Sequence, residues 1–113
     1  MSVTKDEYVI VGVNIGYDNF DSEKDEDLML YGGVDKFGSG SNPFGVLYDG
    51  MNGKYAIAGK VIAHGDMYDG TDLTSITVPE IAHVQVEVAK WLKEKELVKE
   101  PYLIQIYIVS HFH

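Results

Sequence analysis

The sequence predicts an α+β fold, in which a mostly antiparallel sheet of about five strands packs on one amphipathic helix in the order β-β-β-β-α-β. Three observations predict it. Apolar and more polar residues alternate over residues 8–15, turn dipeptides separate two apolar runs around residues 49–53, and a helical apolar stripe follows a capping box at residues 77–80. The chain has 113 residues with 45% apolar content, so we expect a single α+β domain over residues 1–113.

The first strand is expected over residues 8–15, because four apolar side chains there fall on one face of an extended chain. Residues 16–20 break this period. The charged run at residues 21–27 cannot join a buried layer, so it is expected to be an exposed loop. Residues 28–31 form a short apolar run that predicts a second strand, which ends at Gly32 and Gly33.

A hairpin is expected in the middle of the chain. Residues 37–43 combine glycine, serine and proline and predict an exposed loop before it. Residues 46–48 and 55–63 then flank residues 49–53, which contain both Asp-Gly and Asn-Gly, the dipeptides that favour positive φ in hairpin turns. Gly59 in the second arm predicts a bulge or a close approach of another backbone.

One helix is expected after a third loop at residues 64–75. The capping box at residues 77–80 marks its start, and Pro101 places its end near Leu97. Its apolar stripe consists of Ile81, Val84, Val88, Trp91 and Leu92.

The last strand is expected over residues 102–109. Its nearly continuous apolar character favours a central position in the sheet, covered on both faces. One helix covers only part of such a sheet, so we expect the opposite face to be partly exposed, which would favour a homodimer or partner binding.

Charge excludes several function classes. The chain has 18 acidic residues and nine basic ones, all lysine, for a net charge of −9. Without arginine, which recognises phosphates and guanine edges through a bidentate fork, direct nucleic acid binding is not expected. A protein partner with a basic surface is the expected partner, although this charge also serves solubility alone. Residues 1–72 carry 13 acids and five lysines (net −8), so an acidic surface must lie mainly there.

The expected location and redox chemistry of the protein rest on residues and segments that the sequence lacks. Cysteine is absent, which excludes thiolate nucleophiles and cysteine-bound metals and fits a reducing compartment. The N-terminus lacks the basic start and apolar run of a secretory signal, and no apolar run is long enough for a membrane span. We therefore expect a cytoplasmic protein with no membrane contact.

The densest group of acidic side chains precedes the second expected strand. It comprises Asp18, Asp21, Glu23, Asp25, Glu26 and Asp27. Its spacing lacks the central glycine and closing glutamate of an EF-hand, so calcium binding is not predicted, and a solvated loop is the plain alternative. We expect these carboxylates to bind a partner, with Tyr17 and Phe20 as apolar anchors.

Histidines offer two further groups. His64 is followed by three aspartates at regular spacing, namely Asp66, Asp69 and Asp72. These could form an acid–base pair or a metal site, but such a loop is also an ordinary hydrophilic connection. His111 and His113 fall on one side of an extended strand, as two metal ligands would, without a third ligand, and His83 is expected at the helix surface.

No catalytic motif is present. The sequence lacks a Gly-x-Ser-x-Gly elbow, and the glycine-rich residues 38–43 lack the ending of a phosphate loop. We predict no catalytic residue, no cofactor and no metal. The expected function is a non-enzymatic interaction protein, an inhibitor encoded by a virus or mobile element that blocks the basic surface of a host nucleic-acid-binding protein. The alternatives are a ligand-binding or enzymatic domain, with His64, Asp66 or His83 at a pocket between helix and sheet, and a structural homodimer.

Overall fold

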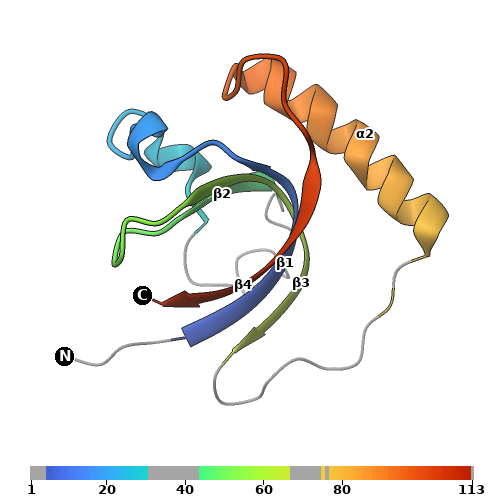
Figure 1. The fold of residues 1–113 in the computed structure, drawn as a ribbon, viewed down its shortest axis with the longest axis horizontal. Coiled ribbons are helices and arrows are strands. Elements are labelled where there is room, and N and C mark those ends of the chain that lie inside the picture. The colour runs from blue at the N-terminus through green and yellow to red at the C-terminus, as the bar shows by residue number, and fades with distance from the viewer. Residues whose placement is uncertain (1–4, 31–43, 67–74, 76, 113) are drawn as a thin grey trace.

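The computed structural model describes residues 5–30, 44–66, 75 and 77–112. Its elements are β1 (Lys5–Asn14), the short 3₁₀ helices η1 (Tyr17–Asn19) and η2 (Glu26–Leu28), β2 (Phe44–Tyr48), β3 (Ala56–Asp66), α2 (Val78–Lys95) and β4 (Gln105–Phe112). The four strands form one antiparallel sheet in the order β2-β3-β1-β4, and α2 lies against one face of it (Figure 1). The α+β prediction is confirmed, with four strands instead of five. The predicted loop at residues 37–43 lies outside the described residues.

The predicted hairpin is confirmed, and its turn is fixed by Asp49. β2 and β3 pair antiparallel, and the Asp49 N–H donates to the Tyr55 carbonyl at 3.0 Å. The Asp49 carboxylate accepts the backbone N–H groups of Asn52 at 3.0 Å and Lys54 at 2.9 Å. Gly53 adopts a φ of +67°, which glycine adopts without steric cost. The Asn-Gly dipeptide therefore supplies the positive φ.

Three glycines lie side by side across the sheet, one each in β1, β3 and β2. Gly12 pairs with Gly59, and Gly59 pairs with Gly45. A Cβ on Gly59 would overlap the carbonyl oxygen of Val11 and lie 2.7 Å from the Gly12 Cα. A side chain on Gly45 would overlap Leu30. The predicted close approach at Gly59 is thus confirmed, while the bulge lies further along β3, opposite Val9 and Ile10.

One predicted strand and several predicted boundaries are wrong. β1 begins at Lys5 instead of residue 8, and β4 spans Gln105–Phe112 instead of residues 102–109. Residues 28–30 form no strand, because only Met29 makes an isolated bridge to Val46, and the Leu30 N–H donates to the Val46 carbonyl at 3.0 Å. Residues 64–66 do not begin a loop. They continue β3, which stays paired with β1 as far as Asp66.

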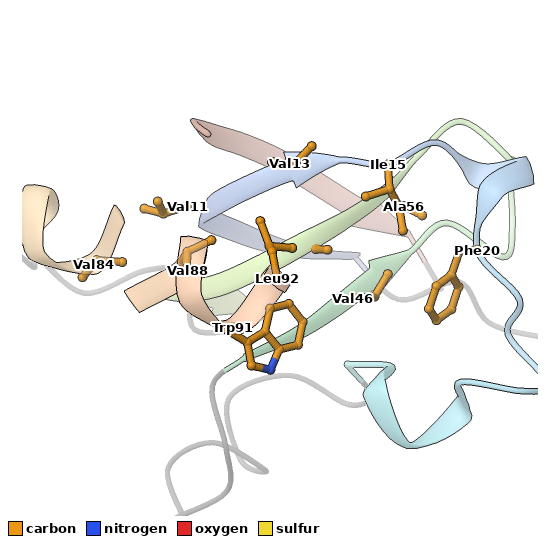
Figure 2. Packing of buried hydrophobic residues seen from close by; sticks show 11 residues of the cluster. Val11, Val13, Ile15, Phe20, Val46, Ala56, Val84, Val88, Trp91 and Leu92 are labelled. Carbon is orange, nitrogen blue, oxygen red and sulfur yellow. The ribbon is translucent and has the colours of Figure 1, made fainter. Parts of the chain in front are cut away.

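The helix matches its prediction closely. The Thr77 hydroxyl accepts the backbone N–H of Glu80 at 3.2 Å, and the helix ends at Glu96, whose φ is +53°. Figure 2 shows the apolar side chains of α2 turned toward those of the sheet. The buried ones are Val84, Val88, Trp91 and Leu92. No helix of the described residues is long and apolar enough to cross a membrane.

The prediction that the last strand is central is wrong, because β4 pairs only with β1 among the described strands and forms an edge of the sheet. Its apolar run divides between two faces. His111 is buried, while Ile108 on the alternate side is 84% exposed.

The sheet face away from α2 is concave (Figure 1), and it is partly exposed, in line with the expectation, because Val61, Tyr107 and Val109 are only partly buried there. A second cluster fills it, comprising Tyr8, Ile10, Leu47 and Ile57. These side chains form a buried cluster on the sheet face opposite α2.

Candidate functional site

The acidic segment, residues 18–27, is an ordered surface built on two 3₁₀ turns. The Asp21 carboxylate accepts the backbone N–H groups of Glu23 and Lys24, both at 3.1 Å, and the Asp25 N–H donates to the Asp21 carbonyl at 2.9 Å. This arrangement satisfies N–H groups that a helical turn leaves without partners. Asp21 therefore shapes the segment in addition to contributing charge.

Aromatic packing holds the acidic segment on the domain. The Phe20 ring is 7% exposed and lies 5.5 Å from the Tyr48 ring, measured between centroids. Tyr17, just before the segment, stacks against the same Tyr48 ring, with 4.8 Å between centroids and an interplanar angle of 13°. A hydrogen bond to Tyr48 raises the pKa of the Tyr17 hydroxyl. The two residues expected to anchor a partner are thus engaged within the domain, and Phe20 in this conformation is a core residue.

The carboxylates of the acidic segment face solvent. Asp25 is half-buried, and the exposed ones are Asp18, Asp21, Glu23, Glu26 and Asp27. Within the described part of the chain, none of the six forms a salt bridge. Residues 18–23 also line a shallow depression of about 460 Å³. The structure therefore leaves five of the six predicted carboxylates exposed on this segment, with Lys24 as the basic residue among them.

A second group of polar side chains lies on the concave face, and we call it the concave-face cluster: Asp6, Tyr8, Tyr55, His64 and His111. His64 Nε2 lies 3.0 Å from an Asp6 carboxylate oxygen, and both side chains are less than a tenth exposed. The Tyr8 ring lies 4.7 Å from the His64 ring and 6.0 Å from the His111 ring. Burial, together with the Asp6 carboxylate, raises the pKa of Tyr8.

The concave-face cluster joins two distant ends of the bent sheet. The Tyr55 hydroxyl lies 2.6 Å from His111 Nδ1, although the two residues are 56 positions apart in sequence. Tyr55 precedes β3 at the hairpin, and His111 lies near the end of β4. In a flat sheet these two ends would lie far apart. The contact between Tyr55 and His111 therefore depends on the curvature of the sheet.

Sequence reasoning named two of the five residues of this cluster, His64 and His111. We expected His64 to pair with the aspartates that follow it, but strand register places it beside Asp6 instead, since His64 lies opposite Tyr8. Asp66 lies opposite Asp6 in the same register, while Asp69, Asp72 and His113 lie outside the described residues. The described residues contain no group of three His, Asp or Glu side chains that could hold a metal ion. The sequence signal that could have identified Asp6 is its spacing. Asp6, Tyr8 and Ile10 lie two residues apart, so they share one face of the strand.

Tyr55 provides a test of the cluster through pH. Burial, with the Asp49 carboxylate as a lesser cause, raises its pKa to about 12 from an ordinary 10. Because the folded state holds this proton more tightly than the unfolded state, the contribution is complete below pH 10 and is lost as the pH rises toward 12. We expect the free energy of unfolding to fall over this range, by about 1 kcal/mol after allowance for partial exposure.

Urea denaturation at pH 9, 10 and 11 measures this fall, with Tyr55→Phe as the comparison. The variant lacks the ionising hydroxyl, so its stability should change less over the same range. An equal fall in both proteins would contradict the role assigned to Tyr55.

A groove between α2 and β3 occupies the place where the sequence predicted a pocket between helix and sheet. It has a volume of about 580 Å³, and His83 lines it while His64 does not. Glu87 bridges two bases there, at 3.3 Å from the Lys60 amine and 3.7 Å from His83 Nε2. Glu80 also lines the groove, together with the apolar residues Val61, Ile62, Pro79 and Val84.

Comparison with known proteins adds no relative, because no family model, no curated protein and no solved structure matches the chain. The class that the fold and surface define is an acidic α+β domain with one helix on a bent antiparallel sheet. Function must therefore be argued from the residues themselves.

Proposed function

We propose that the chain is a non-enzymatic interaction protein whose acidic segment covers the basic surface of a nucleic-acid-binding protein. The observation that carries the proposal is the set of exposed carboxylates on ordered turns, none in a salt bridge within the described residues. Turns that are ordered before binding lose less conformational entropy when a partner binds. The protein would act as an inhibitor in the cytoplasm, of the kind that a virus or mobile element encodes.

The charge pattern supports a protein partner over nucleic acid itself. A net charge of −9 without arginine repels a phosphate backbone and attracts a basic groove. Attraction of this kind speeds association and weakens as salt screens it. A nucleic acid and this chain would then compete for the same surface of the partner.

The concave-face cluster favours a second candidate, a ligand-binding or enzymatic domain. Its supporting observation is the buried contact between His64 and Asp6, since a histidine oriented by a carboxylate is a common acid–base arrangement. Within the described residues no hydrogen-bonding atom of a buried side chain lacks a partner, so the cluster already satisfies itself. A structural role in the bent sheet explains it with fewer assumptions.

The proposal predicts loss of binding when four acidic-segment charges are removed. The variant is Asp18→Asn, Glu23→Gln, Glu26→Gln and Asp27→Asn, and it keeps Asp21, which the turn requires. A matched control neutralises four exposed glutamates elsewhere, namely Glu7, Glu94, Glu96 and Glu100. Each protein has a net charge of −5, because four of the carboxylates that give −9 are removed.

The measurement is retention of a cellular protein on the immobilised domain, followed by competition with duplex DNA. We expect the wild type and the control to retain a basic protein that DNA or moderate salt releases, and the acidic-segment variant to retain at least about tenfold less. Equal retention by the two variants would show that position does not matter and would contradict the proposal. Retention that excess DNA leaves unchanged would exclude competition for a nucleic-acid site.

A further inference from the structure

The two edges of the sheet differ in how they are covered. At the β2 edge, Met29 bridges Val46 and the Leu30 N–H donates to the Val46 carbonyl at 3.0 Å, so residues 29–30 lie along that strand. At the β4 edge, no described strand lies beyond it. Natural sheets usually protect such an edge with lysine, proline or a bulge, because it can otherwise pair with another strand.

β4 carries none of these protections. Its sequence, Gln105–Phe112, contains no lysine or proline, and its pairing with β1 runs without a register shift. On the side shared with α2, three apolar side chains reach solvent: Ile106 is 49% exposed, Ile108 84% and Phe112 39%. The edge therefore combines a regular backbone with an apolar surface.

We propose that β4 pairs antiparallel with β4 of a second copy of this chain, so that two sheets join into one across a twofold axis. This inference is independent of the acidic segment and goes beyond the proposed function. A strand is the occupant that an open sheet edge accepts, because main-chain groups on alternate residues point away from β1.

Charge favours a second copy at this place. Two chains of net charge −9 repel each other wherever their carboxylates meet. Residues 101–113 are the longest stretch of the sequence without aspartate, glutamate or lysine, and β4 lies within it. Two copies can therefore approach along β4 with the least repulsion.

The side-chain pattern of β4 is also self-complementary. In a twofold pair, residues on the same sheet face must lie opposite one another, so positions of equal parity pair. A pairing centred on Val109 places each Ile106 opposite Phe112 of the other copy, and each Ile108 opposite Ser110. The two symmetry-related Ile106–Phe112 pairs then lie on the sheet face shared with α2, where such cross-strand contacts would stabilise the joined sheet.

Sedimentation equilibrium of the wild type, Ile108→Lys and Val86→Lys tests the dimer. Val86 is 67% exposed on α2, so the control adds the same charge to a similar apolar position away from β4. We expect a dimeric wild type, a dimer Kd at least about tenfold higher for Ile108→Lys, and no change for Val86→Lys. A monomeric wild type, or an equal effect of both substitutions, would overturn the inference.

Cross-linking tests the register. The chain has no cysteine, so Ile108→Cys chains can be mixed with Ser110→Cys chains under mild oxidation. The expected result is more disulfide-linked dimer in the mixture than in either variant alone. A dimer that shows no such preference would overturn pairing centred on Val109.

Discussion

Replacement of Gly59 by alanine is expected to destabilise the domain by about 3 kcal/mol or more. The added Cβ would overlap the Val11 carbonyl oxygen and lie 2.7 Å from the Gly12 Cα, and both of these are backbone atoms of the neighbouring strand. No side-chain rotation can relieve such a contact, so β1 and β3 must separate or the bend must open. Since small domains are stable by about 5–15 kcal/mol, this loss would be a large fraction of the total.

Gly50→Ala is the matched control for this substitution. A Cβ there would lie 3.7 Å from the Tyr48 ring, an ordinary contact, and the Gly50 φ is not positive. The change should therefore alter the free energy of unfolding by less than about 1 kcal/mol. Alanine restricts the conformations of the unfolded chain more than glycine does, so this small change should favour the folded state. Urea denaturation measures both variants, and similar effects of the two would refute the role of Gly59 in the close approach of β3 to β1.

Removal of the Asp6 carboxylate should have the second largest effect. Asp6→Ala leaves His64 without the partner that now lies 3.0 Å from its Nε2, in a place where both side chains are almost fully buried. Removing one partner of a buried polar pair leaves the other desolvated and uncompensated. We expect a loss of about 2–3 kcal/mol in the free energy of unfolding.

The neighbouring residue offers a control of the same type. Glu7 is exposed and forms a surface pair with Lys5 at 3.3 Å, so Glu7→Ala should cost less than about 1 kcal/mol. Chemical denaturation at neutral pH separates the two cases. If Asp6→Ala proved as mild as Glu7→Ala, the buried contact with His64 would contribute little to stability. Packing alone would then have to stabilise the concave-face cluster.

Local sequence signals predicted those elements whose information is contained in a few neighbouring residues. The N-cap at Thr77, the apolar stripe of α2 and the hairpin turn before β3 were all predicted correctly, because caps, helical periods and positive φ are local properties. The failures involve longer distances. The run at residues 28–30 has the composition of a strand, but within the described residues it makes only an isolated bridge, from Met29 to Val46.

The candidate site likewise combines features that are visible in the sequence with features that depend on tertiary contacts. Clustering of carboxylates at residues 18–27 is visible in the sequence, whereas burial of Phe20 and the turn built on Asp21 depend on contacts with Tyr48 and on backbone geometry. Sequence spacing also suggested that His64 would meet the aspartates after it. Strand register placed it beside Asp6, 58 positions away.

By itself, the sequence determined the α+β class, the helix with its buried stripe, the hairpin and the acidic character of the first two thirds of the chain. The tertiary structure alone decided which strand lies at the edge and what the concave face contains. An apolar run has the same composition in a central strand and at an exposed edge, so β4 could be placed only by its pairing with β1. The curvature of the sheet (Figure 1) brings Tyr55 to His111, and this curvature depends on contacts between strands that no local pattern records.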